Sequence, residues 1–168
     1  VQSTTLVADL DLDQVSITID FNGENLLLFG AVSGGTASDI IVIFKGPHVP
    51  LALRKKERAS GIWMNKQTIL WQNAPSFYHI FSSRALDEIL SEEQQDNLHI
   101  GAEHIGLRSS EAILDKEKAT LWRRALTRNM TERGLWKLSE NNVSIIRGAL
   151  FRAPVYLPAN IVPGEYEV

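Results

Sequence analysis

The chain has 168 residues and a formal net charge of −3, from 17 Lys and Arg against 20 Asp and Glu. This length supports one folded domain with a sizeable core. The balanced charge argues against a dedicated nucleic-acid binder, which needs a basic face. The chain has no Cys, which excludes disulfides, thiol catalysis and thiolate metal sites.

The first half of the chain has the pattern of β-strands. Apolar side chains alternate with polar ones over residues 15–21, which predicts a strand with one solvated face. Residues 26–32 and 40–44 are apolar at successive positions, which is typical of central strands covered on both faces or of strands that bear an extra layer. After a turn at residues 46–50, further short strands are expected at 51–53, 61–65, 68–71 and 77–82.

The middle of the chain changes to a helical period. Leu86, Ile89 and Leu90 follow helical spacing, and Ser91-Glu92-Glu93-Gln94 has the form of a capping box that opens a short helix. A second helix is expected to begin after Asp115 and to end at Gly134. Its apolar stripe is formed by Ala119, Trp122, Leu126 and Met130, widened by Leu121 and Ala125. The two helices form an insertion at about residues 84–134.

Strand patterns return at residues 135–138, 143–146 and 150–157, with a last short strand at 165–168. Runs of strands on both sides of a helical segment favour a sandwich over a parallel α/β sheet, which needs helices between most strands. We therefore predict a mainly β fold, an immunoglobulin-like antiparallel β-sandwich with an inserted pair of α-helices. A single domain is expected over residues 1–168.

No pattern of an enzyme or a metal site is found. The four His include His99 and His104, but their spacing of five residues matches neither a helical nor a strand ligand pair. There is no Gly-x-Ser-x-Gly elbow and no phosphate-binding glycine loop. We therefore expect a protein that is not an enzyme and holds no metal or other cofactor.

The one dense basic segment contains Arg54, Lys55 and Lys56, followed by Glu57 and Arg58. It could contact phosphate, lipid headgroups or an acidic partner at the end of a hairpin. The alternative, which we prefer, is a solvated strand edge whose Lys side chains prevent association with another sheet.

The aromatic segment is the most distinctive part of the sequence. Its candidate binding residues are Trp63, Asn65, Trp71 and Tyr78. Aromatic side chains with a polar group often line recognition surfaces and sugar platforms, but they also fill sandwich cores. We prefer a core position for Trp63, Phe77 and Phe81, and a surface position for Tyr78, which has the opposite strand parity to Phe77.

Ordered motifs along almost the whole chain resemble the alphaproteobacterial transmembrane protein family Alph_Pro_TM. The motifs are Val15-Ser16-Ile17-Thr18, Leu28-Phe29-Gly30-Ala31, Gly46-Pro47, Arg54-Lys55-Lys56, Gly61-Ile62-Trp63-Met64-Asn65, Ala74-Pro75-Ser76-Phe77-Tyr78, Leu86-Asp87-Glu88-Ile89-Leu90, Leu150-Phe151-Arg152, Leu157-Pro158-Ala159-Asn160 and Gly164-Glu165-Tyr166. The family usually has Val at the position of Met64. The resemblance implies a periplasmic β-rich region followed by a C-terminal membrane helix, often encoded near sulfite-exporter-like permeases, and it identifies no catalytic residue.

From the residues and the resemblance together we expect the periplasmic, membrane-anchored domain of a larger protein. The short strand at 165–168 is expected to lead into the membrane helix, which this sequence lacks. The expected role is protein–protein interaction with a membrane or envelope protein, such as the permease, and not with nucleic acid. The alternative is a ligand- or carbohydrate-binding module that uses exposed aromatic side chains.

Overall fold

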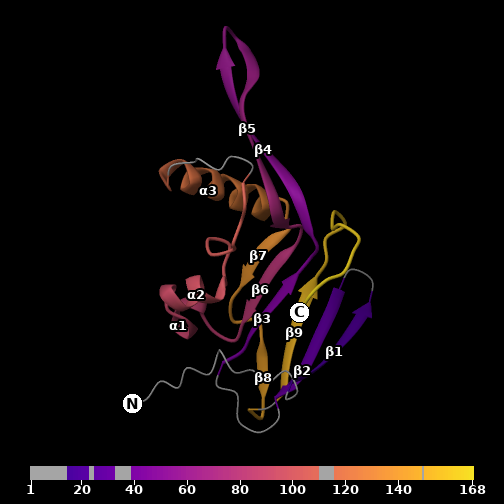
Figure 1. Ribbon diagram of the computed structural model, residues 1–168. Helices are drawn as coiled ribbons and strands as arrows, with labels where there is room; N and C mark the ends of the chain where they lie inside the picture. The colour runs from indigo at the N-terminus through magenta and orange to yellow at the C-terminus, as the bar shows by residue number, and fades with distance from the viewer. Residues whose placement is uncertain (1–14, 23–24, 33–38, 110–115, 149) are drawn as a thin grey trace. The chain divides into compact units, whose positions relative to one another are not determined.

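The structure is a computed structural model that describes residues 15–22, 25–32, 39–109, 116–148 and 150–168 (Figure 1). Its elements are, in chain order, β1 (Val15–Asn22), β2 (Asn25–Val32), β3 (Ile41–Lys45), β4 (His48–Ala59), β5 (Ile62–Pro75), β6 (Tyr78–Ser82), α1 (Leu86–Ile89), α2 (Glu92–Leu98), α3 (Lys116–Glu132), β7 (Trp136–Ser139), β8 (Ser144–Ile146) and β9 (Leu150–Tyr156). The predicted mainly β class is confirmed.

The strands form three sheets, with the orders β1-β2-β9-β8, β3-β6-β7 and β4-β5. The pairs β1–β2, β2–β9, β8–β9 and β4–β5 are antiparallel. The chain also divides into two compact units, one of residues 1–42, 81–89 and 139–159, the other of 43–80, 90–138 and 160–168. It passes from one unit to the other within each strand of the β3-β6-β7 sheet.

The first unit is built on the β1-β2-β9-β8 sheet. Alternate residues of β9, Phe151, Ala153 and Val155, are buried, as period two requires. They pair with the buried side of β2, where a Cβ on Gly30 would overlap the Phe151 ring, so only glycine fits there. The expectation that β2 is covered on both faces is wrong, because Phe29 on its other face is 38% exposed.

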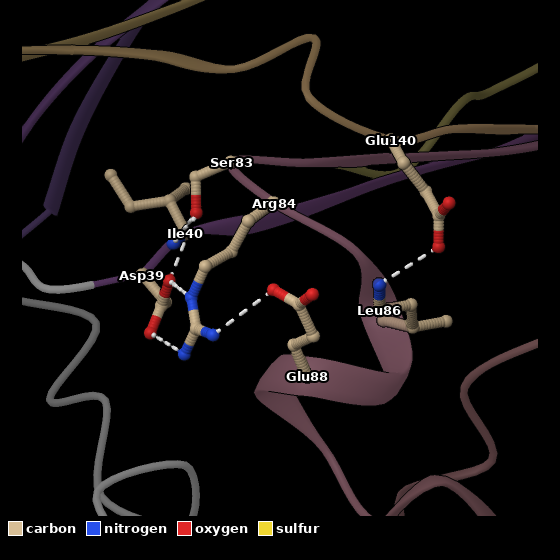
Figure 2. Close-up of polar contacts among 7 residues, drawn as sticks. All are labelled: Asp39, Ile40, Ser83, Arg84, Leu86, Glu88 and Glu140. Carbon is tan, nitrogen blue, oxygen red and sulfur yellow. Dashed lines mark hydrogen bonds and ion pairs between the residues drawn. The ribbon is translucent and has the colours of Figure 1, made fainter.

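Polar contacts in the same unit hold the start of β3 against the loop after β6. Figure 2 shows the Arg84 guanidinium directed at Asp39. Its Nε donates to Oδ1 at 2.6 Å, and its Nη2 donates to Oδ2 at 2.8 Å. These hydrogen bonds lower the pKa of Asp39. The backbone N–H of Leu86 donates to Glu140 Oε1 at 2.8 Å. Both sets of contacts join segments far apart in sequence, which is a structural role.

The second unit contains α2 and α3. Ser91 caps α2 and forms the predicted capping box with Gln94. The described residues hold three helices between β6 and β7 where a pair was expected, because the extended backbone of Ser91 separates α1 from α2.

The apolar stripe of α3 is confirmed at Trp122, Leu126 and Met130, which are buried. Leu121 was expected to widen this stripe, but it is 64% exposed, because it lies about 100° around the helix from Trp122. Asp115, after which the helix was predicted to begin, is outside the described residues. Gly134 follows the helix with a φ of 71°, as predicted for its end.

The C-terminal segment packs beside β3 in the second unit. Tyr166 stacks on Phe44 with ring centroids 5.6 Å apart, and Lys45 and Glu167 exchange backbone hydrogen bonds of 2.9 and 2.8 Å. The strand predicted at residues 165–168 is therefore a single bridge at Glu167. Packing of Tyr166, rather than a ladder of hydrogen bonds, fixes this segment.

Candidate interaction site on the β4–β5 hairpin

The largest departure from the predicted strands is the hairpin of β4 and β5. The short strands expected at 51–53, 61–65 and 68–71 are parts of two strands of 12 and 14 residues, and residues 48–50 of the predicted turn belong to β4. Figure 1 shows these strands as a two-stranded arm. The two register shifts, between Val49 and Leu51 and between Lys55 and Lys56, explain why the apolar alternation is broken along both strands.

The turn of the hairpin is a two-residue loop. Ala59 pairs with Ile62, so Ser60 and Gly61 alone connect the strands. Both have positive φ, 53° and 83°, which is the backbone of a type I′ turn. This turn matches the right-handed twist of the strands and lets pairing continue to the end of the hairpin.

The base of the hairpin belongs to the core of the second unit. Ile69 and Trp71 are 0% and 3% exposed. The edge of β5 is covered there by the loop at 106–109, since Gln72 N–H donates to the Arg108 carbonyl oxygen at 2.9 Å. Asn73 reinforces this contact, because its Nδ2 donates to the Gly106 oxygen and its Oδ1 accepts from Arg108 N–H.

The distal hairpin, which we define as residues 54–68, has a different environment. Every side chain described in this range is exposed. At its end lies an apolar tip of three residues, Ile62, Trp63 and Met64, which are 66%, 66% and 55% exposed. Three consecutive, large and exposed apolar side chains at the end of a hairpin are typical of a contact with a partner or a membrane.

The predicted basic residues lie on this distal hairpin. Arg54, Lys55 and Lys56 are in β4 and exposed, together with Arg58. Asn65 lies in β5, but its side chain is outside the described residues. The structure therefore brings the basic segment and Trp63 onto one hairpin. The preference for Trp63 in the core is wrong, because the turn at Ser60-Gly61 places it beyond the packed base.

Trp71 and Tyr78 do not join this site. Trp71 lies at the buried base of the hairpin, where its Nε1 has no hydrogen-bond partner among the described residues. Tyr78 is 2% exposed, and its hydroxyl oxygen accepts a hydrogen bond from Gly101 N–H at 3.2 Å. Burial raises the pKa of Tyr78. The predicted surface position of Tyr78 is wrong because all five residues of β6 are buried, so strand parity does not separate core from surface there.

Phe77 and Phe81 occupy the core positions that were predicted for them, at 0% and 3% exposed. His79 stacks on Phe77 with ring centroids 4.0 Å apart and lies 3.2 Å from the Gly134 carbonyl oxygen through Nε2. Burial lowers the pKa of His79 to about 4, despite this hydrogen bond, so the imidazole is neutral near pH 7. His79 is thus part of the packing in the second unit.

Two other histidines lie close together after α2. His104 Nδ1 is 3.2 Å from Asp96 Oδ1, and His99 Nδ1 is 3.2 Å from the His104 carbonyl oxygen. In the described part of the chain, no three His, Asp or Glu side chains are grouped so that they could bind a metal ion. The His104 ring therefore contacts the last turn of α2, and the His99 ring contacts the backbone of the loop that follows this helix.

Comparison with known protein families identifies the family of this chain. The family described as "Putative transmembrane protein (Alph_Pro_TM)" matches residues 5–168. The chain belongs to this family. No curated protein and no solved structure is significantly similar to it. Among the described residues, no helix combines the length and the apolar character needed to cross a membrane.

The match confirms the family that the sequence motifs resemble, and the distal hairpin contains two of those motifs, at Arg54-Lys55-Lys56 and at Gly61-Ile62-Trp63-Met64-Asn65. Ile62 and Met64 are members of the site that the sequence did not single out as binding residues, whereas Arg58 was part of the predicted basic segment. The Ser60-Gly61 pair was the available signal, since residues that tolerate positive φ between two strand patterns indicate a tight hairpin.

Proposed function

We propose that this chain is the extracytoplasmic, periplasmic domain of a membrane-anchored protein, and that it is an interaction module without enzymatic activity. The partner proposed is a membrane protein, such as a sulfite-exporter-like permease. Membership of a transmembrane protein family supports the membrane context. The immunoglobulin-like sandwich predicted from the sequence is the scaffold proposed for the module.

The observation that carries this proposal is the contrast within the β4–β5 hairpin. Its base is packed and its apolar tip is exposed, although exposure of Ile62, Trp63 and Met64 costs free energy that burial would recover. Strand pairing up to a tight turn orders the backbone of these residues before binding, which lowers the conformational entropy lost on binding. We therefore assign the distal hairpin as the contact element of the module.

The test is site-specific photo-crosslinking of the full-length protein in its native membrane. A photoreactive residue at Ala59, beside the tip, should capture one membrane protein, and the same residue at the exposed position Thr131 on α3 should not. The captured band should disappear in the double variant Ile62→Ser and Met64→Ser. Equal capture from both positions, or no membrane protein captured at Ala59, would contradict the proposal.

A second candidate function is binding of a small ligand or carbohydrate through an exposed aromatic ring. Trp63 supports this alternative by its exposure, whereas Trp71 and Tyr78 are buried and unable to form a platform with it. Titration of the chain with mono- and oligosaccharides while tryptophan emission is recorded tests this function. A saturable change that is absent in Trp63→Ala would support it, and an unchanged spectrum would count against it.

A further inference from the structure

The two faces of the distal hairpin carry different side chains. Along β4, Leu51 and Leu53 are half-buried, and the alternate positions Ala52, Arg54, Lys56 and Arg58 are exposed. The register shift between Lys55 and Lys56 leaves Lys66 of β5 without a register partner, so the extra residue lies on β5 and side chains continue to alternate between faces along β4. The last three of these positions therefore form a row on one face. We call Arg54, Lys56 and Arg58 the basic row. Lys55 lies on the opposite face.

Trp63 lies at the distal end of this row. It is the register partner of Arg58, and directly paired residues share a face of a two-stranded sheet. Successive members of the row are about 7 Å apart, because a strand rises about 3.4 Å per residue. No ion pair of these three basic side chains is found with any of the described side chains, which do not include that of Glu57. The positive charge of the row therefore has no acidic partner among the described side chains.

The tip is apolar on both faces. Ile62 pairs with Ala59, so Ile62 and Met64 lie on the face opposite to Trp63. A protein that docks against one face of a hairpin leaves the other face in water. The interfacial region of a bilayer surrounds an inserted tip on all sides, so it covers Ile62, Trp63 and Met64 together.

We propose that the distal hairpin inserts its tip into the headgroup region of an anionic lipid bilayer, with the basic row against lipid phosphates. This inference rests on the proposed function, because it takes the distal hairpin as the contact element and names the surface around it. Trp side chains favour the membrane–water interface, and Lys and Arg beside an anionic surface are attracted to it. Their long aliphatic parts lie along apolar surface while the charged ends remain solvated.

The depth of insertion follows from the backbone. Both edges of a two-stranded hairpin carry unpaired N–H and C=O groups, which are costly in hydrocarbon. The tip therefore stays within the interface, about 5–10 Å deep, which corresponds to two or three residues of strand. At this depth Trp63 and Arg58 lie among the headgroups, and Lys56 and Arg54 lie progressively nearer to the aqueous side.

The chain contains its own probe for this contact. Of its four Trp, Trp71, Trp122 and Trp136 are 3%, 9% and 1% exposed, whereas Trp63 is 66% exposed. We expect phosphatidylcholine vesicles that contain phosphatidylglycerol to shift the emission of Trp63 to shorter wavelength and to sediment with the chain. Vesicles of phosphatidylcholine alone, and inorganic phosphate at equal ionic strength, should produce neither effect.

The deciding variant neutralises the basic row, with Arg54→Gln, Lys56→Gln and Arg58→Gln, and keeps Trp63. Each lost charge should weaken vesicle binding about fivefold, and the three together about a hundredfold. The matched control carries the same charge change at other exposed positions of the second unit, with Arg124→Gln, Arg128→Gln and Lys137→Gln. Circular dichroism and the midpoint of urea unfolding show that both variants remain folded.

The outcomes separate this inference from the proposed function. Equal weakening in the two triple variants, or equal binding to neutral and anionic vesicles, would overturn the bilayer contact. If vesicles fail to bind while crosslinking from Ala59 still captures a membrane protein, the bilayer contact is wrong and the proposed interaction module is supported.

If vesicles bind through the basic row and no membrane protein is captured, the bilayer contact is supported and the proposed partner is wrong. Association through the tip with a second copy of the chain, detected by sedimentation velocity without lipid, would also overturn the bilayer contact.

Discussion

The two ends of the β4–β5 hairpin have the same strands and opposite environments. At the base, Ile69 and Trp71 are buried and the edge of β5 is covered by the loop at 106–109. At the distal end, Ile62 and Trp63 are two-thirds exposed. Backbone pairing continues without interruption between them, apart from the register shift at Lys55 and Lys56. The base therefore contributes to stability, and the distal end exposes side chains that the packed core does not use.

The largest expected effect comes from the same substitution at the two ends of β5. Ile69→Ala removes a fully buried side chain and should lower the free energy of unfolding by about 3–4 kcal/mol, from lost burial and the cavity left behind. Ile62→Ala, at an exposed position, should change it by less than about 0.5 kcal/mol. Urea unfolding followed by circular dichroism measures both. Similar losses for the two variants would show that the tip is packed in solution.

A fall in pH should lower the free energy of unfolding, through His79 in the packed part of the second unit. The pKa of His79 is lowered from 6.5 to about 4 by burial, so the unfolded chain binds a proton there before the folded one does. The contribution of His79 is fully present above about pH 6.5 and is lost progressively as the pH falls towards 4. The loss amounts to roughly 3 kcal/mol at most.

The measurement is the free energy of unfolding at several pH values between 7 and 4. His79→Gln should flatten its dependence on pH, although this variant also loses the ring contact with Phe77. The control His48→Gln, at an exposed residue near the start of β4, should retain the slope of the unchanged chain. A slope that persists in His79→Gln would assign the pH dependence to other groups.

The smallest effect is expected at the turn. Gly61 has a φ of 83°, and Ala at this position should cost about 1 kcal/mol, because an L side chain is strained there. No atom lies within 4 Å of a Cβ built on Gly61, so the cost is conformational and not steric packing. Gly61→Ala should increase the rate of proteolysis within the distal hairpin and leave the base intact. Cleavage at the base as well would show that the two ends unfold together.

The sequence predicted the strands whose apolar period is regular, and the helix stripe of α3. It also predicted the capping box at Ser91, because side chain and backbone groups three residues apart form it locally. It failed at Tyr78 because the alternation rule assumes one solvated face, and both faces of β6 are covered. It divided β4 and β5 into short strands because two register shifts interrupt the period along a continuous ladder.

The sequence also placed Trp63 in the core for a physical reason. Its apolar neighbours Ile62 and Met64 are typical of a packed strand, and burial is the usual result for such a run. Exposure depends on where the hairpin leaves the packed core of the second unit, which is decided by contacts of Gln72 and Asn73 with the loop at 106–109. These residues are more than 30 positions apart in the chain, so no local pattern reports the contact.

The sequence by itself determined the family, the mainly β class and the basic and aromatic motifs, because these depend on residue type and short-range spacing. The tertiary structure decided which aromatic side chains are buried and which are exposed. It also decided that Arg54, Lys56 and Arg58 share a face with Trp63, because the turn at Ser60-Gly61 and the register of the hairpin bring two separate motifs together. Burial and shared faces are properties of the packed chain, and they arise only when distant segments meet.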